Sequence, residues 1–327
     1  MATEGNGYTM RAARWRHGES CAPIDDTQVV SELRSQDHLT WALVHVDDPE
    51  GTGRFLVDKL GFHPSEVHDA LSDLERPALR QREDGVFLVA PVVRQEEEGE
   101  AFTEVAFFLG EDYLVTVNPG VAPVLNEWLE RWQRHPDEVG PSPAHLVHGL
   151  LDAIVDDYFP VVDSLQDTLD ELENQIFEGR RFDVREGLAL KRRLLELRRR
   201  VAPLRDVING LLRRDIQFVP AEVRVLLQDV YDHTMRLLEN LDVNRDILSS
   251  ILDAHLTVTS NRLNEVMKFL AVVSTILMTN ALIAGIYGMN FVVMPELKWL
   301  LGYPFAILLM TVLSAAEWIY FRRRGWV

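Results

Sequence analysis

Charged residues occur throughout most of the chain but are missing from two stretches near its C-terminus. Residues 269–295 hold no charged side chain, and none occurs between residues 299 and 316. As a helix, residues 269–289 span about 31 Å, which matches the roughly 30 Å hydrocarbon core of a bilayer. The second apolar run, residues 303–321, is interrupted by Glu317. The pattern predicts two transmembrane helices; the alternative is a buried helical hairpin in a soluble protein.

The residues that flank these runs favour the membrane interpretation. Arg262 and Lys268 precede the first run and a basic segment, residues 322–327, follows the second, whereas the loop 290–302 has one acidic and one basic residue, Glu296 and Lys298. Because positive charge stays inside, we expect both termini in the cytoplasm and the protein in the cell membrane. Aromatic residues suited to an interface belt lie near the ends of the runs: Tyr287, Trp299, Tyr303, Trp318 and Tyr320.

The region ahead of the membrane begins with a segment of mixed character. Residues 27–142 contain short runs rich in β-branched residues, such as 43–46 and 86–93, together with helices that open on proline. These features predict a small α/β domain. Residues 1–26 have arginines but no apolar core, so we expect a disordered tail rather than a signal peptide. The single cysteine, Cys21, allows no internal disulfide, as is usual in the cytosol.

Residues 143–268 are predicted to be helical, with breaks near 179–183 and 218–220. The last helix begins near Glu222 and meets no proline or glycine before Gly285. Continued through the first membrane run it is about 100 Å long, more than a single domain needs. A helix of this length is suited to a stalk that packs against symmetry copies of itself.

The net charge of −18 argues against nucleic acid as a partner and favours cations. Two charged runs are interpreted as ordinary surface. Residues 95–100 (QEEEGE) are expected to form a solvated hairpin turn. Residues 191–200 (KRRLLELRRR) interleave leucines with arginines, which indicates an amphipathic helix with a charged outer face.

One face of the long helix carries small, weakly polar or methionine residues as it enters the membrane. Steps of three and four give Asp253, Thr257, Ser260, Asn264, Met267, Ala271, Ser274, Met278, Ala281 and Gly285. Small residues in a membrane helix serve close helix packing. A pore lining with methionine constrictions needs the same composition. The stripe is compatible with both uses.

The first membrane run ends in residues 287–291 (YGMNF), followed by 294–297 (MPEL). An amide at a pore mouth can bind a cation through its carbonyl oxygen without removing the ion's water, which suits Mg²⁺ because Mg²⁺ dehydrates reluctantly. Gly288 is expected to let the backbone turn at the helix end. The Gly-Met-Asn tripeptide after the first of two C-terminal spans resembles the CorA family of divalent cation transporters. Similar segments are 151–159 (LDAIVDDYF), 229–233 (DVYDH), 264–268 (NEVMK), 284–291 (AGIYGMNF), 302–304 (GYP) and the basic C-terminus.

The resemblance implies a funnel-shaped homopentamer with an α+β cytosolic domain, a stalk and a pore lined by five copies of the long helix. The outer selectivity ring is then Gly288, Met289 and Asn290. The predicted pore and gate combine the family's constriction with the stripe: Asn264, Met267, Leu270, Ser274, Met278, Ala281 and Gly285. Magnesium is the expected substrate, with cobalt and nickel tolerated, and no cofactor is expected. Magnesium is also the expected regulator, held between Asp69 and Asp253 of a neighbouring copy.

Three positions depart from the family's pattern. His68 stands where a carboxylate usually precedes Asp69, and a neutral histidine is a poorer Mg²⁺ ligand. Thr279-Asn280 stands where relatives often have a proline, so we expect no kink there. Glu317 replaces an apolar residue, and we expect it to snorkel toward the arginines at 322–324.

Other functions remain open at this point. A zinc transporter of the same superfamily is the nearest alternative, although that branch tends to carry a changed tripeptide. A membrane-anchored regulatory protein that moves no ion is another. An enzyme is disfavoured, because the histidine pairs His63/His68 and His145/His148 come with neither an activated nucleophile nor an acid/base carboxylate pair.

Overall fold

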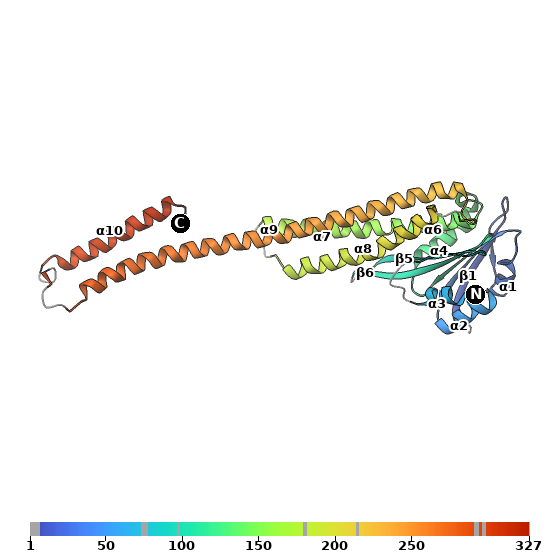
Figure 1. Ribbon diagram of the computed structural model, residues 1–327, viewed down its shortest axis with the longest axis horizontal. Helices are drawn as coiled ribbons and strands as arrows, with labels where there is room; N and C mark the ends of the chain where they lie inside the picture. The colour runs from blue at the N-terminus through green and yellow to red at the C-terminus, as the bar shows by residue number, and fades with distance from the viewer. Residues whose placement is uncertain are drawn as a thin grey trace. The chain divides into compact units, whose positions relative to one another are not determined.

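The computed structural model describes residues 7–72, 78–96, 99–178, 182–213, 216–290, 294–295 and 299–326. Contacts divide the chain into two compact units, Met1–Ser249 and Ser250–Val327. Unit 1 contains a sheet and its covering helices (Figure 1). Unit 2 contains the two apolar helical segments. One helix, α9 (Ala221–Tyr287), has residues in both units.

The sheet of unit 1 has seven described strands in the order β2-β1-β3-β7-β6-β5-β4. The pairing of β3 with β7 is parallel and the other pairings are antiparallel. This confirms the predicted mixed α/β character of the region. The strands are β1 (Tyr8–Trp15), β2 (Ala22–Ile24), β3 (Leu39–Val46), β4 (Leu79–Gln81), β5 (Val86–Glu96), β6 (Gly99–Leu109) and β7 (Tyr113–Asn118).

The first strands correct the expectation of a disordered tail over residues 1–26. β1 pairs along its whole length with β3, and β2 pairs with β1. Within β1, Met10, Ala12 and Trp15 are buried, so this segment supplies core side chains although it lacks a continuous apolar run. Met10 and Ala12 point to one face of the sheet, and Ala13 and Trp15 are buried on the other, because successive strand residues point to opposite faces.

Helices cover both faces of the sheet. One face packs against α1 (Asp26–Glu32), the π-helix η1 (Phe55–Lys59) and α3 (Pro64–Leu71). On the other face, Trp41 of β3 lies 6.0 Å from Trp132 of α4 (Pro123–Arg134), measured between ring centroids. Successive strand residues point to opposite faces, which explains why β3 is buried along nearly its whole length. The remaining short helices are α2 (Pro49–Arg54) and α5 (Pro136–Val139).

The hairpin of β5 and β6 lies beside the helical part of unit 1. On the β4 side, the pairing of β5 extends to Val89, whose N–H bonds the carbonyl of Ala78 over 2.9 Å, and no later residue of β5 has a partner there among the described residues. This accommodates Pro91, because its backbone has no N–H to donate. Within the run 95–100, where the acidic turn is predicted, Glu96 and Gly99 pair with each other. Residues 97 and 98 are outside the described residues.

The helical region starts with two helices where the sequence predicts one. α6 (Pro143–Asp156) ends at Asp157 and α7 (Tyr158–Phe177) begins directly after it. Pro160 accounts for the break, because it has no N–H to bond the carbonyl four residues earlier. Tyr158, fully buried at this junction, donates a hydrogen bond of 3.1 Å to the carbonyl of Pro91 in β5.

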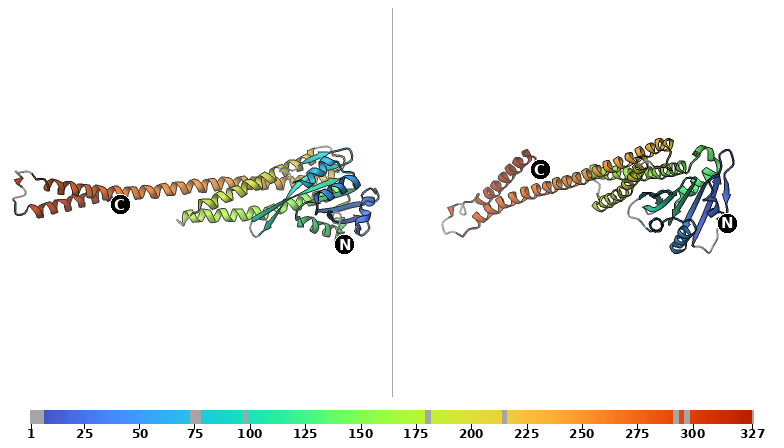
Figure 2. Two further views of the ribbon diagram at one scale, coloured as in Figure 1. Left: turned by 90° about the horizontal axis from the view of Figure 1, so that it is seen from below. Right: turned by 45° about the vertical axis from the view of Figure 1, so that its right-hand side comes forward.

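Helices α7 and α8 (Val184–Arg213) run alongside the first part of α9 (Figures 1 and 2). The predicted amphipathic character of α8 is confirmed. Its buried residues include Leu190, Leu194 and Leu197, while its arginines reach acidic partners. Arg193 pairs with Glu100 of β6.

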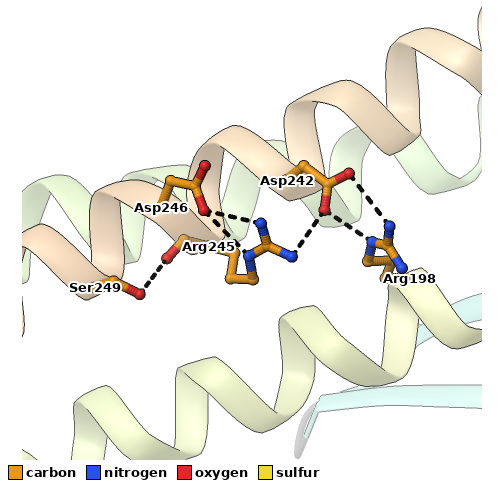
Figure 3. A network of polar contacts seen from close by, with 5 residues as sticks. All are labelled: Arg198, Asp242, Arg245, Asp246 and Ser249. Carbon is orange, nitrogen blue, oxygen red and sulfur yellow. Dashed lines mark hydrogen bonds and ion pairs between the residues drawn. The ribbon is translucent and has the colours of Figure 1, made fainter.

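A polar network joins α8 to α9 within unit 1 (Figure 3). Arg198 of α8 donates from Nε to the Asp242 carboxylate over 2.8 Å, and Arg245 lies 3.3 Å from the same carboxylate. Arg245 also pairs with Asp246. The basic run therefore has intramolecular acidic partners, which fits its interpretation as a charged helix surface.

The second unit contains the end of α9 and α10 (Gly302–Arg323). α9 continues as one helix through Thr279-Asn280. Residues 291–293 and 296–298, which include Phe291, Glu296, Leu297 and Lys298 of the predicted loop, lie outside the described residues.

Candidate functional site

Among the described residues, two helices are long and apolar enough to span a membrane: α9 and α10. In their most apolar windows, 11% and 6% of the residues are buried. A core hairpin of a soluble protein buries most of such residues, so the soluble alternative does not fit. Large side chains such as Leu282 and Leu308 are more than half exposed in the isolated chain. They need an apolar surrounding, which lipid or copies of the chain can provide.

The predicted pore residues form an exposed face of α9. Met278 is 72% exposed, and Asn264, Ser274, Ala281 and Gly285 are exposed as well. At about 100° of rotation per residue, the predicted set from Met267 to Gly285 falls within an arc of about 80°. The buried side chains Val272 and Ile283 lie on the opposite side of the helix. The stripe is therefore free for a partner other than its own chain.

The predicted selectivity ring lies just beyond the end of α9. Gly288, Met289 and Asn290 follow the last helical residue and are exposed. Gly288 lies in a turn directly after the last residue of α9, but its φ is not positive. Its N–H still bonds the carbonyl of Ala284 over 2.9 Å, and a Cβ at this position would lie 3.2 Å from that oxygen. Close approach to its own helix, rather than a positive φ, favours glycine here.

Two polar contacts join α9 to α10 within unit 2. The Thr279 hydroxyl donates a hydrogen bond of 2.7 Å to Glu317 Oε1. The Asn280 amide donates to Ser314 Oγ over 2.9 Å. The expected snorkelling of Glu317 toward the arginines at the end of α10 is therefore wrong. A bonded partner is available on α9, which is less costly than stretching along the helix to reach water.

The two predicted regulatory carboxylates belong to different units. Asp69 of α3 forms an ion pair with Arg80 of β4, and its side chain is mostly buried. Asp253 is exposed on α9. His68, next to Asp69, lies in the last turn of the same helix. A cation at Asp69 has to compete with the Arg80 guanidinium, which already neutralises that carboxylate.

A second group of metal-ligating side chains lies where α6 approaches α9 in unit 1. Asp152, Asp156 and His233 present ligand atoms that all lie within 4.8 Å of one another. His233 Nδ1 lies 3.8 Å from Asp152 Oδ1 and 3.9 Å from Asp156 Oδ1. Its Nε2 lies 3.8 Å from Asp229 Oδ1. We call these four residues the α6–α9 cluster.

The electrostatics of the α6–α9 cluster suit a divalent cation. The Nδ1 atom of His233 is buried and has no hydrogen-bond partner. Burial, with the nearby Asp156 carboxylate second, raises the pKa of Asp152. Burial also lowers the pKa of His148, which lies one turn before Asp152 on α6. A positive ion among these carboxylates would relieve their mutual repulsion and favour their charged forms.

The sequence does not single out this cluster as a site, although segments 151–159 and 229–233 both resemble the family. The signal was present in the spacing. Asp152 and Asp156 are four residues apart, as are Asp229 and His233, so each pair occupies one face of a helix. What the sequence could not provide is the approach of these two helix faces, because Asp156 and Asp229 are 73 positions apart along the chain.

Comparison with known proteins identifies the chain's relatives. The family described as CorA-like Mg²⁺ transporter protein matches residues 36–323. The cobalt/magnesium transport protein CorA of Thermotoga maritima is 32% identical over 310 residues, covering 92% of this chain and 87% of that protein. The YfjQ protein of Bacillus subtilis is 36% identical, covering 90% and 92%.

A solved structure shares the fold as well. The complete structure of the CorA magnesium transporter from Methanocaldococcus jannaschii matches with a TM-score of 0.84 and 23% identity, covering 97% of this chain and 98% of that one. This agrees with the predicted α+β region, long helix and two C-terminal apolar helices. With its two exposed apolar helices, the chain is a membrane protein. It belongs to the family of CorA-like Mg²⁺ transporter proteins.

Proposed function

We propose that this chain passes divalent cations, magnesium first among them, across the membrane through a pore lined by α9. The observation that carries the proposal is the exposed face of α9, which runs from Asn264 to Gly285 and leads to Asn290. Membership of a transporter family, whose named relatives carry cobalt and magnesium, supports the same function. Both termini lie in the cytoplasm in this proposal, as the basic flanks favour.

Several copies of α9 are needed to enclose a pore, and the proposed assembly is a homopentamer. Five copies bring five Asn290 side chains together at the outer end. Amide oxygens arranged in a ring can bind a hydrated Mg²⁺ through its water shell, because Mg²⁺ keeps several waters when it binds proteins. Below that ring, Met278, Leu270 and Met267 form apolar constrictions, which close a pore by excluding water from it.

Cytosolic magnesium regulates the pore in this proposal. A cation that binds the closed assembly better than the open one shifts the equilibrium toward closure. The family resemblance places one such site at Asp69 and Asp253 of neighbouring copies. The Arg80 partner of Asp69 weakens that assignment. The α6–α9 cluster supports a second site, because it brings two carboxylates and one imidazole nitrogen together within one chain, while Asp229 lies at the other ring nitrogen of His233.

The donor set of that cluster also bears on the choice of metal. Carboxylates suit Mg²⁺, whereas imidazole suits Co²⁺, Ni²⁺ and Zn²⁺. The presence of His233 therefore favours a cytosolic site that responds to transition metals as well as to magnesium. Because the His233 imidazole suits zinc, zinc transport is the second candidate function.

Metal uptake into proteoliposomes distinguishes the candidate functions. Mg²⁺, Co²⁺, Ni²⁺ and Zn²⁺ are compared with and without a proton gradient, using metal-sensitive dyes trapped inside. We expect Mg²⁺ entry without a gradient, and Co²⁺ and Ni²⁺ entry at comparable or lower rates. Zinc entry that needs a proton gradient, without magnesium entry, would establish the second candidate. Absence of all metal entry would leave a membrane-anchored regulatory protein.

A further inference from the structure

Thr279 departs from the usual behaviour of threonine in a helix. A threonine hydroxyl commonly donates to the carbonyl four residues earlier in its own helix. Thr275, one turn before, does so with Ala271 over 2.9 Å, and Thr311 does so with Ile307 over 2.8 Å. Thr279 instead donates across to Glu317 on α10. The difference shows that a partner on α10 has drawn this hydroxyl out of the local pattern.

The neighbouring residue makes a second, reciprocal contact. Asn280 donates from its side-chain amide nitrogen to Ser314 Oγ. The Ser314 hydroxyl in turn donates to the side-chain carbonyl oxygen of Asn280 over 3.3 Å. Both contacts are available at once because α10 presents Ser314 and Glu317 one turn apart on one face. We call these four residues the α9–α10 clamp.

The clamp lies on the side of α9 opposite to the proposed pore lining. Met278 and Ala281 flank Thr279 and Asn280 in sequence. With about 100° per residue, the direction midway between Thr279 and Asn280 is about 180° from the direction midway between Met278 and Ala281. A helix held at two adjacent residues that are about 100° apart cannot turn about its axis without breaking one of the contacts. The clamp therefore fixes which residues face away from α10.

A carboxylate at position 317, inside an apolar helix, has a free-energy cost. Glu317 is the acidic residue of an otherwise apolar run, and its second oxygen, Oε2, is buried without a hydrogen-bond partner among the described residues. Ionisable side chains inside membrane helices face protein rather than lipid and mark a functional constraint. A contact made only for helix association needs no carboxylate, because small residues suffice.

We propose that Thr279, Asn280, Ser314 and Glu317 are positioning residues that set the rotation of α9, so that Met278 and Ala281 face the ion pathway. This inference rests on the proposed function. The four side chains touch each other rather than the ion. Their loss lets α9 turn, which moves Met278 out of the constriction and weakens closure.

The test measures the rotation of α9 directly. Single cysteines replace Met278 and, separately, Val273 in a Cys21→Ser background of the full-length protein in liposomes, and a charged, membrane-impermeant methanethiosulfonate reagent modifies them. The clamp predicts modification at position 278 at least about tenfold faster than at 273, because the two positions lie about 140° apart. Thr279→Val, which keeps the side-chain shape, should reduce this ratio at least threefold.

Matched variants separate rotation from general damage. Thr279→Ser keeps the hydroxyl and should restore the ratio, and the exchange Asn280→Ser with Ser314→Asn should preserve it. Thr275→Val and Thr311→Val remove hydroxyls that bond within their own helices and should leave it unchanged. Glu317→Leu should act like Thr279→Val, with magnesium leak into the same vesicles rising at least threefold.

The outcomes distinguish this inference from the proposed function. If the parent protein carries magnesium but Thr279→Val and Glu317→Leu keep both the labelling ratio and the leak of the parent, the clamp does not position α9 and the inference fails alone. If Thr275→Val lowers the ratio as much as Thr279→Val, the effect is one of helix stability and the inference fails as well. If the parent carries no metal, the proposed function fails, whatever the labelling shows.

Discussion

The hydroxyl of Thr279 in α9 donates a hydrogen bond of 2.7 Å to the carboxylate of Glu317 in α10. The contact joins two apolar helices at a point where neither has another charged residue within two turns toward the segment 290–302 that connects them. A carboxylate placed at such a point is held by protein, since lipid offers it no donor. The contact therefore ties the helix that carries the proposed pore face to its neighbour.

The apolar constriction provides the first prediction. Met278→Ala and Leu270→Ala widen and wet a pore that closes by excluding water, so basal leak of magnesium should rise severalfold. Phe269→Ala is the control, because Phe269 precedes Leu270 and points about 100° away from it. Leak is measured in liposomes at a fixed internal magnesium concentration. Variants that lose thermal stability without leaking would show that the stripe serves helix packing.

The α6–α9 cluster provides the second. Removal of one ligand from a site with three or four ligands should weaken binding at least about tenfold. Asp152→Asn should weaken Mg²⁺ and Co²⁺ alike, whereas His233→Ala should weaken Co²⁺ more than Mg²⁺, because imidazole is the softer ligand. Calorimetric titration of the purified protein measures both affinities. Asp232→Asn, next to His233 in sequence, is the control, and equal affinities in all variants would remove the cluster from consideration.

The third prediction concerns the regulatory pair taken from the family resemblance. Asp253→Lys and Asp69→Lys should transport at internal magnesium concentrations that silence the parent, because two facing carboxylates no longer need a cation between them. Alanine versions accompany them, since a lysine can replace the missing cation. Asp167→Lys on α7 is the control. Unchanged protection of α9 by magnesium against protease in all four variants would place the sensor elsewhere.

The cysteine provides a test of the fold near β2. Burial raises the pKa of Cys21 to about 12. At pH 8 the thiolate fraction is then about 10³-fold smaller than for a thiol with an unperturbed pKa, and the thiolate is the form that reacts. Iodoacetamide should modify Cys21 at least about 100-fold more slowly in the folded protein than in denaturant. Equal rates would show that residues near β2 are not packed against the sheet.

The junction of α6 and α7 provides a stability prediction. Tyr158→Phe removes the hydrogen bond to the Pro91 carbonyl and should lower the free energy of unfolding by about 1–2 kcal/mol. Tyr303→Phe is the control, because Tyr303 is 80% exposed. Thermal unfolding in detergent measures the difference. A loss equal to that of the control would mean that the Tyr158 hydroxyl contributes nothing measurable.

The predictable parts of the molecule were those that a single local pattern determines. The absence of charge over residues 269–295 predicted the membrane part of α9, and the proline at position 123 marked the first residue of α4. β1 was missed because Arg11 and Arg14 interrupt its buried residues, so that it has no apolar block. The break at Asp157 was missed because the residues on both sides of Pro160 favour a helix, and that pattern hid the effect of the proline.

The polar contacts were less predictable for a different reason. The partner of Glu317 is 38 residues earlier in the chain, and the choice between Thr279 and the nearby arginines depends on how α9 and α10 pair. The α6–α9 cluster likewise needs two helix faces to meet. Sequence spacing shows which residues share a face, but it does not show which faces approach each other.

The measurement that tests the central claim most directly is magnesium entry into liposomes that contain either the parent protein or Asn290→Ala, at equal protein density. Asn261→Ala, an exposed asparagine of α9 that lies off the stripe, is the control. The account predicts rapid entry with the parent and the control, and entry no faster than in empty liposomes with Asn290→Ala, while all three assemble alike. Entry through Asn290→Ala at the parent rate would contradict the account.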